Sequence, residues 1–225
     1  MVSKVKLDFS IIPRFIPMLL DGVRMTILLT LMAVGIGVVL GLVAALMKMS
    51  KFKLLRFIAS AYIEIIRGTP LMIQLYLVYF GMPQLIGFII PDAIASVCAL
   101  GFNSGAYVSE IIRAGIMSVD RGQTEAAYSL GMNSNMTMRY IIIPQAVKNI
   151  LPALVNEFIT LIKESSVVSV IGLTELTRKA NMITSVTFRA FEPLIVVAFL
   201  YFILTFTLSK FMGGFERRLR KSDYR

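Results

Sequence analysis

The sequence predicts an all-α membrane protein with five transmembrane helices, and three observations support that fold class. Hydrophobic residues occupy 57% of the 225 positions, and the mean hydropathy of +0.79 is well above the average for a soluble domain. Residues 27–47 run for 21 positions without a charge, enough at about 1.5 Å per residue to cross about 30 Å of hydrocarbon. The sequence shows none of the short alternating segments of an outer-membrane barrel, so helices are the expected spanning structure.

Five apolar stretches of spanning length follow one another and are expected to form one membrane domain from residue 1 to residue 225. In the first stretch, Gly37 and Gly41 are four residues apart, a spacing that lets a neighbouring helix approach closely. In the second, Pro70 removes a helix donor and clashes with an earlier carbonyl, so a break or kink is expected there. The spans are expected at about 23–47, 54–80, 93–112, 149–172 and 193–212.

The stretch before the first span, residues 9–16, is apolar and contains Pro13. It can be an interfacial segment or a frayed tail, and the sequence leaves both open.

Basic residues predict how the chain is oriented in the membrane. An odd number of spans places the termini on opposite sides, and Lys and Arg favour the cytoplasmic side. With a cytoplasmic C-terminus, the inside segments hold fourteen of these residues and the outside segments seven. We therefore expect a multi-pass cell-membrane protein with its N-terminus outside, although Lys4 and Lys6, which lie close to the first span, favour the opposite orientation.

Several kinds of chemistry are excluded by composition. Cys98 is the single cysteine and there is no histidine, so an internal disulfide, a His-based zinc site and a Ser/His/Asp triad are ruled out. No G-x-x-x-x-G-K-[ST] loop is present, so the chain cannot bind ATP in that way. The net charge of +10 comes from cations at the ends of apolar runs, which indicates topology rather than nucleic-acid binding. We expect a chain that is not an enzyme, with no metal and no cofactor of its own.

Polar residues gather between the third and fourth spans, over about 119–145. A short helix that opens at Thr124 can end at Gly131 in the left-handed conformation. A second short helix, about 135–140, would stop ahead of Pro144. The segment is therefore expected to form a compact knob at the cytoplasmic surface.

This segment resembles a known family motif. The pattern Glu125-Ala126-Ala127, then Gly131, then Ile141 and Ile143-Pro144 is similar to the EAA loop of permease subunits of binding-protein-dependent ABC importers, with Ile143 where leucine is commoner. Residues 62–71, 107–115 and 161–166 resemble the polar amino-acid branch, which includes histidine, arginine, glutamine and cystine importers. The likeness covers about residues 20–220 and is greatest to the arginine-type permeases.

The resemblance implies a type I ABC importer permease fold and a set of partners. The chain would work beside an identical or paralogous permease, two ATP-binding cassette ATPase subunits that bind ATP and Mg, and an extracytoplasmic substrate-binding protein. The substrate would be an amino acid, and the membrane a bacterial one. The residues implied in coupling to the ATPase are Glu125, Ala126, Ala127, Gly131 and Pro144.

Charged and polar residues at membrane depth are the candidates for the substrate site, because such residues are expensive there. Three polar faces can converge between the second, third and fourth spans and enclose an amino acid. Arg67 or Lys163 would hold the carboxylate, and Glu157 or Glu164 an ammonium or a cationic side chain. The full set is Arg67, Thr69, Asn103, Tyr107, Glu110, Glu157, Lys163, Glu164 and Ser165.

Other interpretations remain open at this level. The intramembrane charges can instead pair with one another and fix the helix register. An ion-driven secondary transporter lacks support, because no inverted repeat is visible and five spans do not divide evenly. A membrane scaffold would not need Arg67, Lys163 and Glu164 at membrane depth. The sequence does not decide which amino acid is carried, nor whether the second permease is an identical chain.

Overall fold

The computed structural model describes residues 7–221, with side chains as far as Gly214, and every regular element in that range is a helix. Lys4, Lys6 and Arg225 of the orientation argument lie outside the described residues, as do the side chains of residues 217–221. The 3₁₀ helices are η1 (Phe9–Ile11) and η4 (Ser165–Ile171), and the π-helical turns are η2 (Leu77–Gly81) and η3 (Met138–Ile142). The α-helices are α1 (Ile12–Met49), α2 (Lys53–Arg67), α3 (Leu71–Tyr76), α4 (Met82–Ile86), α5 (Asp92–Met117), α6 (Arg121–Ser129), α7 (Ser134–Thr137), α8 (Ile143–Glu164), α9 (Leu176–Thr187) and α10 (Phe191–Lys221).

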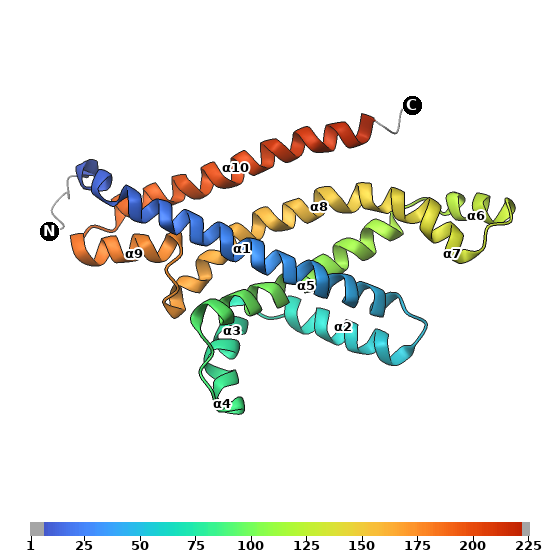
Figure 1. The fold of residues 1–225 in the computed structure, drawn as a ribbon, viewed down its shortest axis with the longest axis horizontal. Coiled ribbons are helices and arrows are strands. Elements are labelled where there is room, and N and C mark those ends of the chain that lie inside the picture. The colour runs from blue at the N-terminus through green and yellow to red at the C-terminus, as the bar shows by residue number, and fades with distance from the viewer. Residues whose placement is uncertain (1–6, 222–225) are drawn as a thin grey trace.

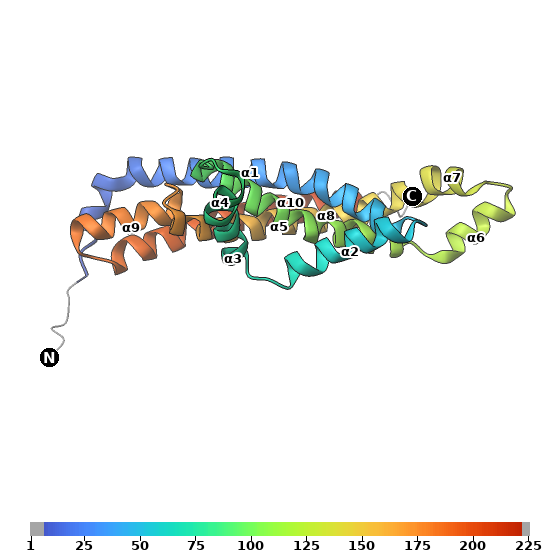
Figure 2. The ribbon, with the colours of Figure 1, turned by 90° about the horizontal axis from the view of Figure 1, so that it is seen from below.

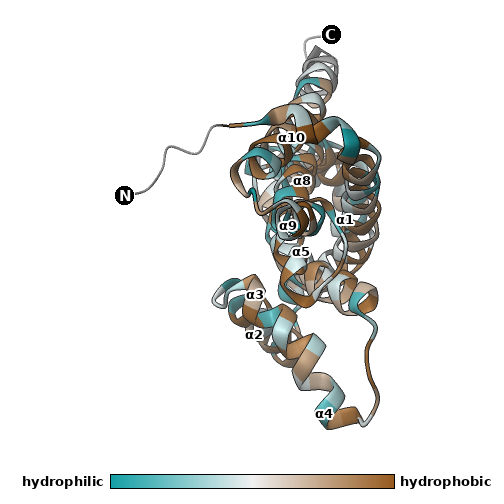
Figure 3. Ribbon diagram, turned by 90° about the vertical axis from the view of Figure 1, so that its left-hand side faces the viewer, coloured by the Kyte–Doolittle hydropathy of each residue, from teal (hydrophilic) through white to brown (hydrophobic). Residues whose placement is uncertain are grey.

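The helices form an elongated bundle with different structures at its two ends (Figures 1 and 2). Helices α1, α5, α8 and α10 run along the bundle. Helix α9 and the start of α1 lie at one end, whereas α6 and α7 project from the other, the end nearest the C-terminus. Figure 3, seen from the α9 end, shows α2, α3 and α4 standing to one side of the other helices.

Small residues bring α1 and α5 into close contact. A β-carbon added to Gly41 would lie 2.5 Å from Cγ1 of Val108, and one added to Gly37 would lie 2.9 Å from Oγ of Ser104. This confirms that the glycine pair in the first span serves helix packing. On α5, Gly101 is confined by Ile36 of α1, and Gly105 by the Tyr62 hydroxyl of α2 and by Leu40 of α1.

The all-α membrane fold is confirmed, and the second span is broken as Pro70 predicts. Two described helical segments, Phe9–Met49 and Phe191–Gly214, are long and apolar enough to cross a bilayer. A third span results if α2 is joined to the segment Leu71–Ile86, from which it is bent by 107°. The count of five spans stays a prediction, because α5 and α8 have the length of a span but polar faces that lower their hydropathy.

Of the two interpretations left open for the apolar stretch 9–16, the frayed tail does not hold, because the stretch is helical and Phe15 packs against a cluster formed by α1, α9 and α10. One expectation about a helix end is wrong. The second knob helix does not stop ahead of Pro144, since α7, η3 and α8 follow without interruption. Pro144 lies in the first turn of α8, where a missing donor costs little, and the π-turn before it makes room for the ring.

A buried carboxylate holds the α9 end together, and neither it nor α9 was predicted. Glu175 is fully buried and accepts hydrogen bonds from the backbone N–H groups of Thr177 and Arg178 and from the Tyr201 hydroxyl, each at 2.8 Å. The backbone N–H of Leu176 donates to Thr26 of α1. Burial raises the pKa of Glu175 above its ordinary value, and these donors act in the opposite direction. The network fixes α9 between α1 and α10.

The α1–α5 contact predicts a difference between two glycine substitutions on the same helix. Gly41→Ala should lower thermal stability by about 1–3 kcal/mol, because the new methyl group overlaps Val108 and lies 3.0 Å from the Gly105 carbonyl. Gly35→Ala is the control, since nothing lies within 4 Å of its added β-carbon. Melting temperatures of the purified variants in detergent measure the effect. Equal melting temperatures for Gly41→Ala and Gly35→Ala would contradict the packing account.

Candidate functional site

The break in the second span leaves backbone carbonyls that other groups must satisfy. Gln74 of α3 does so with its side-chain amide, which donates to the carbonyls of Ile66 and Thr69 at 2.7 and 3.0 Å. The Thr69 hydroxyl donates to the Ile65 carbonyl at 2.9 Å and accepts from Gln74 at 3.0 Å. The break is therefore a defined structure, held by two polar side chains at the end of α2.

Helix α5 completes this network and adds an aromatic ring. The Asn103 amide is buried and donates to the Gln74 side-chain oxygen at 3.1 Å. One turn further, Tyr107 is 37% exposed, and the Arg67 guanidinium lies over its ring, 5.4 Å from the centroid. Four residues of the predicted site, Arg67, Thr69, Asn103 and Tyr107, are thus brought together at the break.

Helix α8 also packs against α5. Glu157 is half-buried beside Ser104 and within electrostatic range of Glu164, which is also half-buried. The Glu157 carboxylate faces the buried Ser104 hydroxyl, which has no other hydrogen-bond partner among the described residues. Lys163 is exposed, and the buried Ser165 hydroxyl donates to the Ile162 carbonyl at 2.7 Å. At the end of α8, Leu161 belongs to the same buried cluster as Leu75 of α3 and Leu100 of α5, so α8 and the break are parts of one core.

Most of the charged residues in this region lack an ionic partner. Among the residues that the structure describes, no ion pair joins Arg67, Lys163, Glu157 or Glu164 to any other group. Glu64, one turn before Arg67, is exposed and does not pair with it either. The alternative that these charges only pair with one another therefore has no support within the described chain.

Glu110 has a different environment from the rest of the predicted site. It pairs with Lys48 of α1 at 2.8 Å and with Arg113, one turn along α5, at 2.8 Å. Its carboxylate is therefore saturated with cations near the α1–α2 turn. The contacts of Glu110 agree with the structural interpretation, in which an ion pair fixes two helices.

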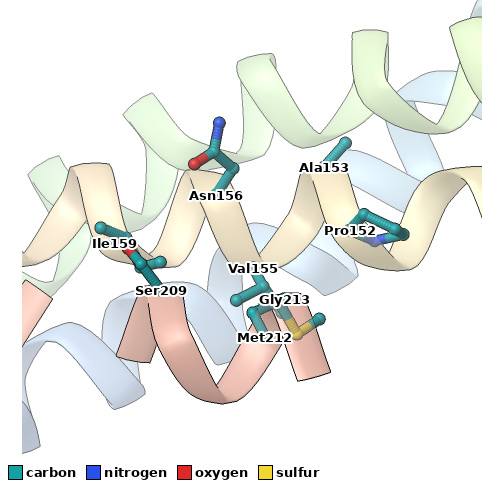
Figure 4. Close-up of a pocket in the computed structure, with 8 residues that line it drawn as sticks. All are labelled: Pro152, Ala153, Val155, Asn156, Ile159, Ser209, Met212 and Gly213. Atoms are coloured by element: carbon teal, nitrogen blue, oxygen red, sulfur yellow. The ribbon is translucent and has the colours of Figure 1, made fainter. Parts of the chain in front are cut away.

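The structure also contains a pocket between α8 and α10, which Figure 4 shows. Its volume is about 390 Å³, and its polar side chains are those of Asn156 and Ser209. None of its eight described lining residues is charged. A free amino acid carries two opposite charges, so this pocket offers it fewer charged contacts than the region around the break does.

The predicted knob is a helical hairpin with well-formed caps. Helix α6 begins at Arg121, three residues earlier than expected, because the Asp120 side chain caps the Gly122 N–H at 2.7 Å. It ends in a Schellman motif, with Gly131 N–H donating to Tyr128 and Met132 N–H to Ala127. Gly131 has φ of +80°, which confirms the left-handed conformation.

The residues implied in coupling lie mostly on the outside of this hairpin. Glu125, Ala126, Gly131 and Pro144 are exposed, whereas Ala127 is buried. The Gln145 side chain of α8 donates to that of Gln123 of α6 at 3.3 Å, so the hairpin is tied to a long helix of the bundle.

Sequence reasoning missed Gln74, although it supports the break. It is the one amide side chain in the apolar run after Pro70, between Leu71 and Phe80. A polar group at membrane depth just after a helix-breaking proline was the available signal. Glu175 gave a weaker signal, because glutamate is not a preferred helix cap.

Three comparisons with known proteins agree with one another. Residues 37–221 match the family described as the binding-protein-dependent transport system inner membrane component. The arginine transport system permease protein ArtQ of Bacillus subtilis (strain 168) is 46% identical over 217 residues, covering 96% of this chain and 99% of that protein. The glutamine transport system permease protein GlnP of Escherichia coli (strain K12) is 37% identical over 214 residues, covering 95% and 98%.

Two solved structures are similar in fold. A chain of an amino acid ABC transporter crystallised with histidines is 56% identical, with a TM-score of 0.93 and coverage of 95% of this chain and 100% of that one. A chain of the MetNI methionine ABC transporter in an inward-facing conformation is 20% identical, with a TM-score of 0.77 and coverage of 92% and 98%. At that identity the second likeness shows the fold alone.

The Gln74 network predicts a stability loss on substitution. Gln74→Leu should cost about 1–3 kcal/mol, because it leaves the Ile66 and Thr69 carbonyls and the Asn103 amide without a protein partner. Asn103→Leu should cost less, since Gln74 keeps its bonds to the break. Melting temperatures of both variants and of the double variant measure the coupling. Additive losses would show that the two side chains act independently.

Proposed function

We propose, since the chain belongs to the family of inner membrane components of binding-protein-dependent transport systems, that it is the permease subunit of an ATP-driven amino-acid importer. Relatives named as arginine and glutamine permeases cover nearly the whole chain. The observation that carries the proposal is the broken span, where Arg67 has no ionic partner among the described residues. Such a site suits a small molecule with charges of both signs.

Arg67 is the group that we assign to the substrate carboxylate. Arg67 is exposed at the last residue of α2, where the second span breaks, and a charge at membrane depth is costly, so a compensating group is expected. The Tyr107 ring contributes a cation–π contact but no negative charge. A carboxylate from the ligand would supply both the charge and the geometry for a bidentate contact.

Glu157 and Glu164 are the groups that we assign to the positive end of the substrate. They lie two turns apart on α8, and Glu157 faces the buried Ser104 hydroxyl of α5. Two carboxylates facing one ligand favour a basic amino acid such as arginine, which carries an ammonium and a guanidinium. Lys163 of α8 and Ser165, the first residue of η4, are the next candidates, together with Asn103 and Tyr107 of α5 and Thr69 at the break.

The energy is proposed to come from partner ATPase subunits that contact the α6–α7 hairpin. This hairpin projects from the bundle at the C-terminal end (Figure 1), and its exposed Glu125 and Gly131 are available to another polypeptide. The Gln123–Gln145 contact gives movement of α6 a route into α8. In this orientation the hairpin and C-terminus are cytoplasmic, whereas the N-terminus and α9 face the extracytoplasmic binding protein.

The substrate site is tested by binding of radiolabelled arginine to the purified complex. Arg67→Ala should weaken binding about 10- to 150-fold, the loss of a charge-assisted contact worth about 1.5–3 kcal/mol. Glu164→Gln should weaken the binding of arginine more than it weakens the binding of glutamine. Arg121→Ala, in the hairpin, is the control and should bind normally. Unchanged affinity in a well-assembled Arg67→Ala complex would rule out this placement of the site.

Coupling is tested at Gly131. Gly131→Val should strain the left-handed position by about 1 kcal/mol or more, whereas Gly131→Asn, which tolerates that conformation, should be milder. We expect substrate binding to persist in both and uptake into vesicles to fall mainly in Gly131→Val. Normal uptake and normal substrate-stimulated ATP hydrolysis in Gly131→Val would refute the coupling role.

A further inference from the structure

The α1–α2 turn carries an unusual concentration of positive charge. Lys51, Lys53 and Arg56 are exposed, and none has an acidic partner in the described part of the chain. The sequence has no Asp or Glu between Asp21 and Glu64 that could neutralise them. Lys48 is close by, but its charge is taken up by Glu110. The turn is therefore a cluster of free cations.

Helix α2 makes this charge more costly than it would be in a loop. Lys53 and Arg56 lie in its first turn, which has no acidic residue, and the N-cap Phe52 provides no side-chain cap. Cations at a helix N-terminus oppose the helix dipole, so an external anion near the turn would relieve the repulsion.

Apolar side chains surround the same cations. Phe52 and Phe57 are 71% and 70% exposed, values that are unfavourable for a turn in water. The turn lies at the end of the bundle that carries α6 and α7 (Figure 1), where the spanning part of α1 ends. Alternating aromatic and basic residues at such a level fit the boundary between lipid headgroups and acyl chains.

An apolar groove continues from the turn into the membrane. It is formed by α1, α2 and α5, has a volume of about 190 Å³, and begins at Met47 and Ile58, next to the basic residues. Its polar atom, the Tyr62 hydroxyl, is already used, because it donates to the Phe102 carbonyl at 2.6 Å. The groove therefore has no polar group left for a hydrophilic ligand.

We propose that the α1–α2 turn and this groove form a binding site for one anionic phospholipid. Lys51, Lys53 and Arg56 hold the phosphate headgroup, and an acyl chain lies along Val43 and Met47 on one side and Ile58 on the other. Charge complementarity selects an anionic headgroup over a zwitterionic one, because juxtamembrane Lys and Arg attract anionic lipids by about 1 kcal/mol each. The site is independent of the proposed substrate site, which lies at the other end of α2.

The headgroup contacts are tested by native mass spectrometry of the delipidated complex, titrated with phosphatidylglycerol and phosphatidylcholine of the same acyl chains. The wild type should bind phosphatidylglycerol preferentially, and the triple variant K51Q/K53Q/R56Q should bind it about 100-fold more weakly. The triple variant R14Q/R24Q/K210Q removes the same charge elsewhere and should keep the wild-type affinity. Equal affinities for both lipids, or no difference between the triple variants, would overturn the proposal.

The groove contacts are tested separately by filling the groove. Val43→Trp should reduce phosphatidylglycerol binding about tenfold, whereas Val39→Trp, one turn away on an exposed part of α1 outside the groove, should not. Full competition by glycerol phosphate would assign the site to a free phosphate compound instead. Loss of the ATPase subunit from K51Q/K53Q/R56Q with lipid binding intact would assign it to a protein contact.

Discussion

A backbone inside a bilayer must satisfy its own hydrogen bonds, and the break in the second span is the place where this chain does so with side chains. At the end of α2, the Thr69 hydroxyl and the Gln74 amide bond the carbonyls of Ile65 and Ile66 in place of a continuing helix. Asn103 of α5 then holds Gln74. The position of Arg67, at the last residue of α2, follows from this arrangement, and so does the sharp bend between α2 and the segment Leu71–Ile86.

Two groups of charges in the bundle differ in a way that separates structure from proposed function. Lys48, Glu110 and Arg113 satisfy one another and fix α1 against α5 near the α1–α2 turn. Arg67, Glu157 and Glu164 remain without ion pairs inside the described chain, although each is as costly to place in a membrane. The proposed substrate, which carries charges of both signs, would compensate all three.

The sequence predicted features that depend on residues close to one another along the chain. Pro70 indicated the break, Gly131 the left-handed cap, and Gly37 with Gly41 the close helix contact. Features that depend on distant partners were missed or misjudged: Lys48 is 62 residues from Glu110, and Gln74 meets Asn103 across 29 residues. Helix α9 was missed because its buried residues, Leu176, Ala180 and Ile183, form too short an apolar stripe to stand out between two spans.

The central claim, that the substrate lies beside the break and not in the pocket between α8 and α10, is tested most directly by protection from a thiol reagent. In a Cys98→Ala background, single cysteines at Thr69 and at Ser209 report on the two places. Arginine should slow labelling of Thr69→Cys in the purified complex and leave the labelling rate of Ser209→Cys unchanged. Protection of Ser209→Cys alone would contradict the account.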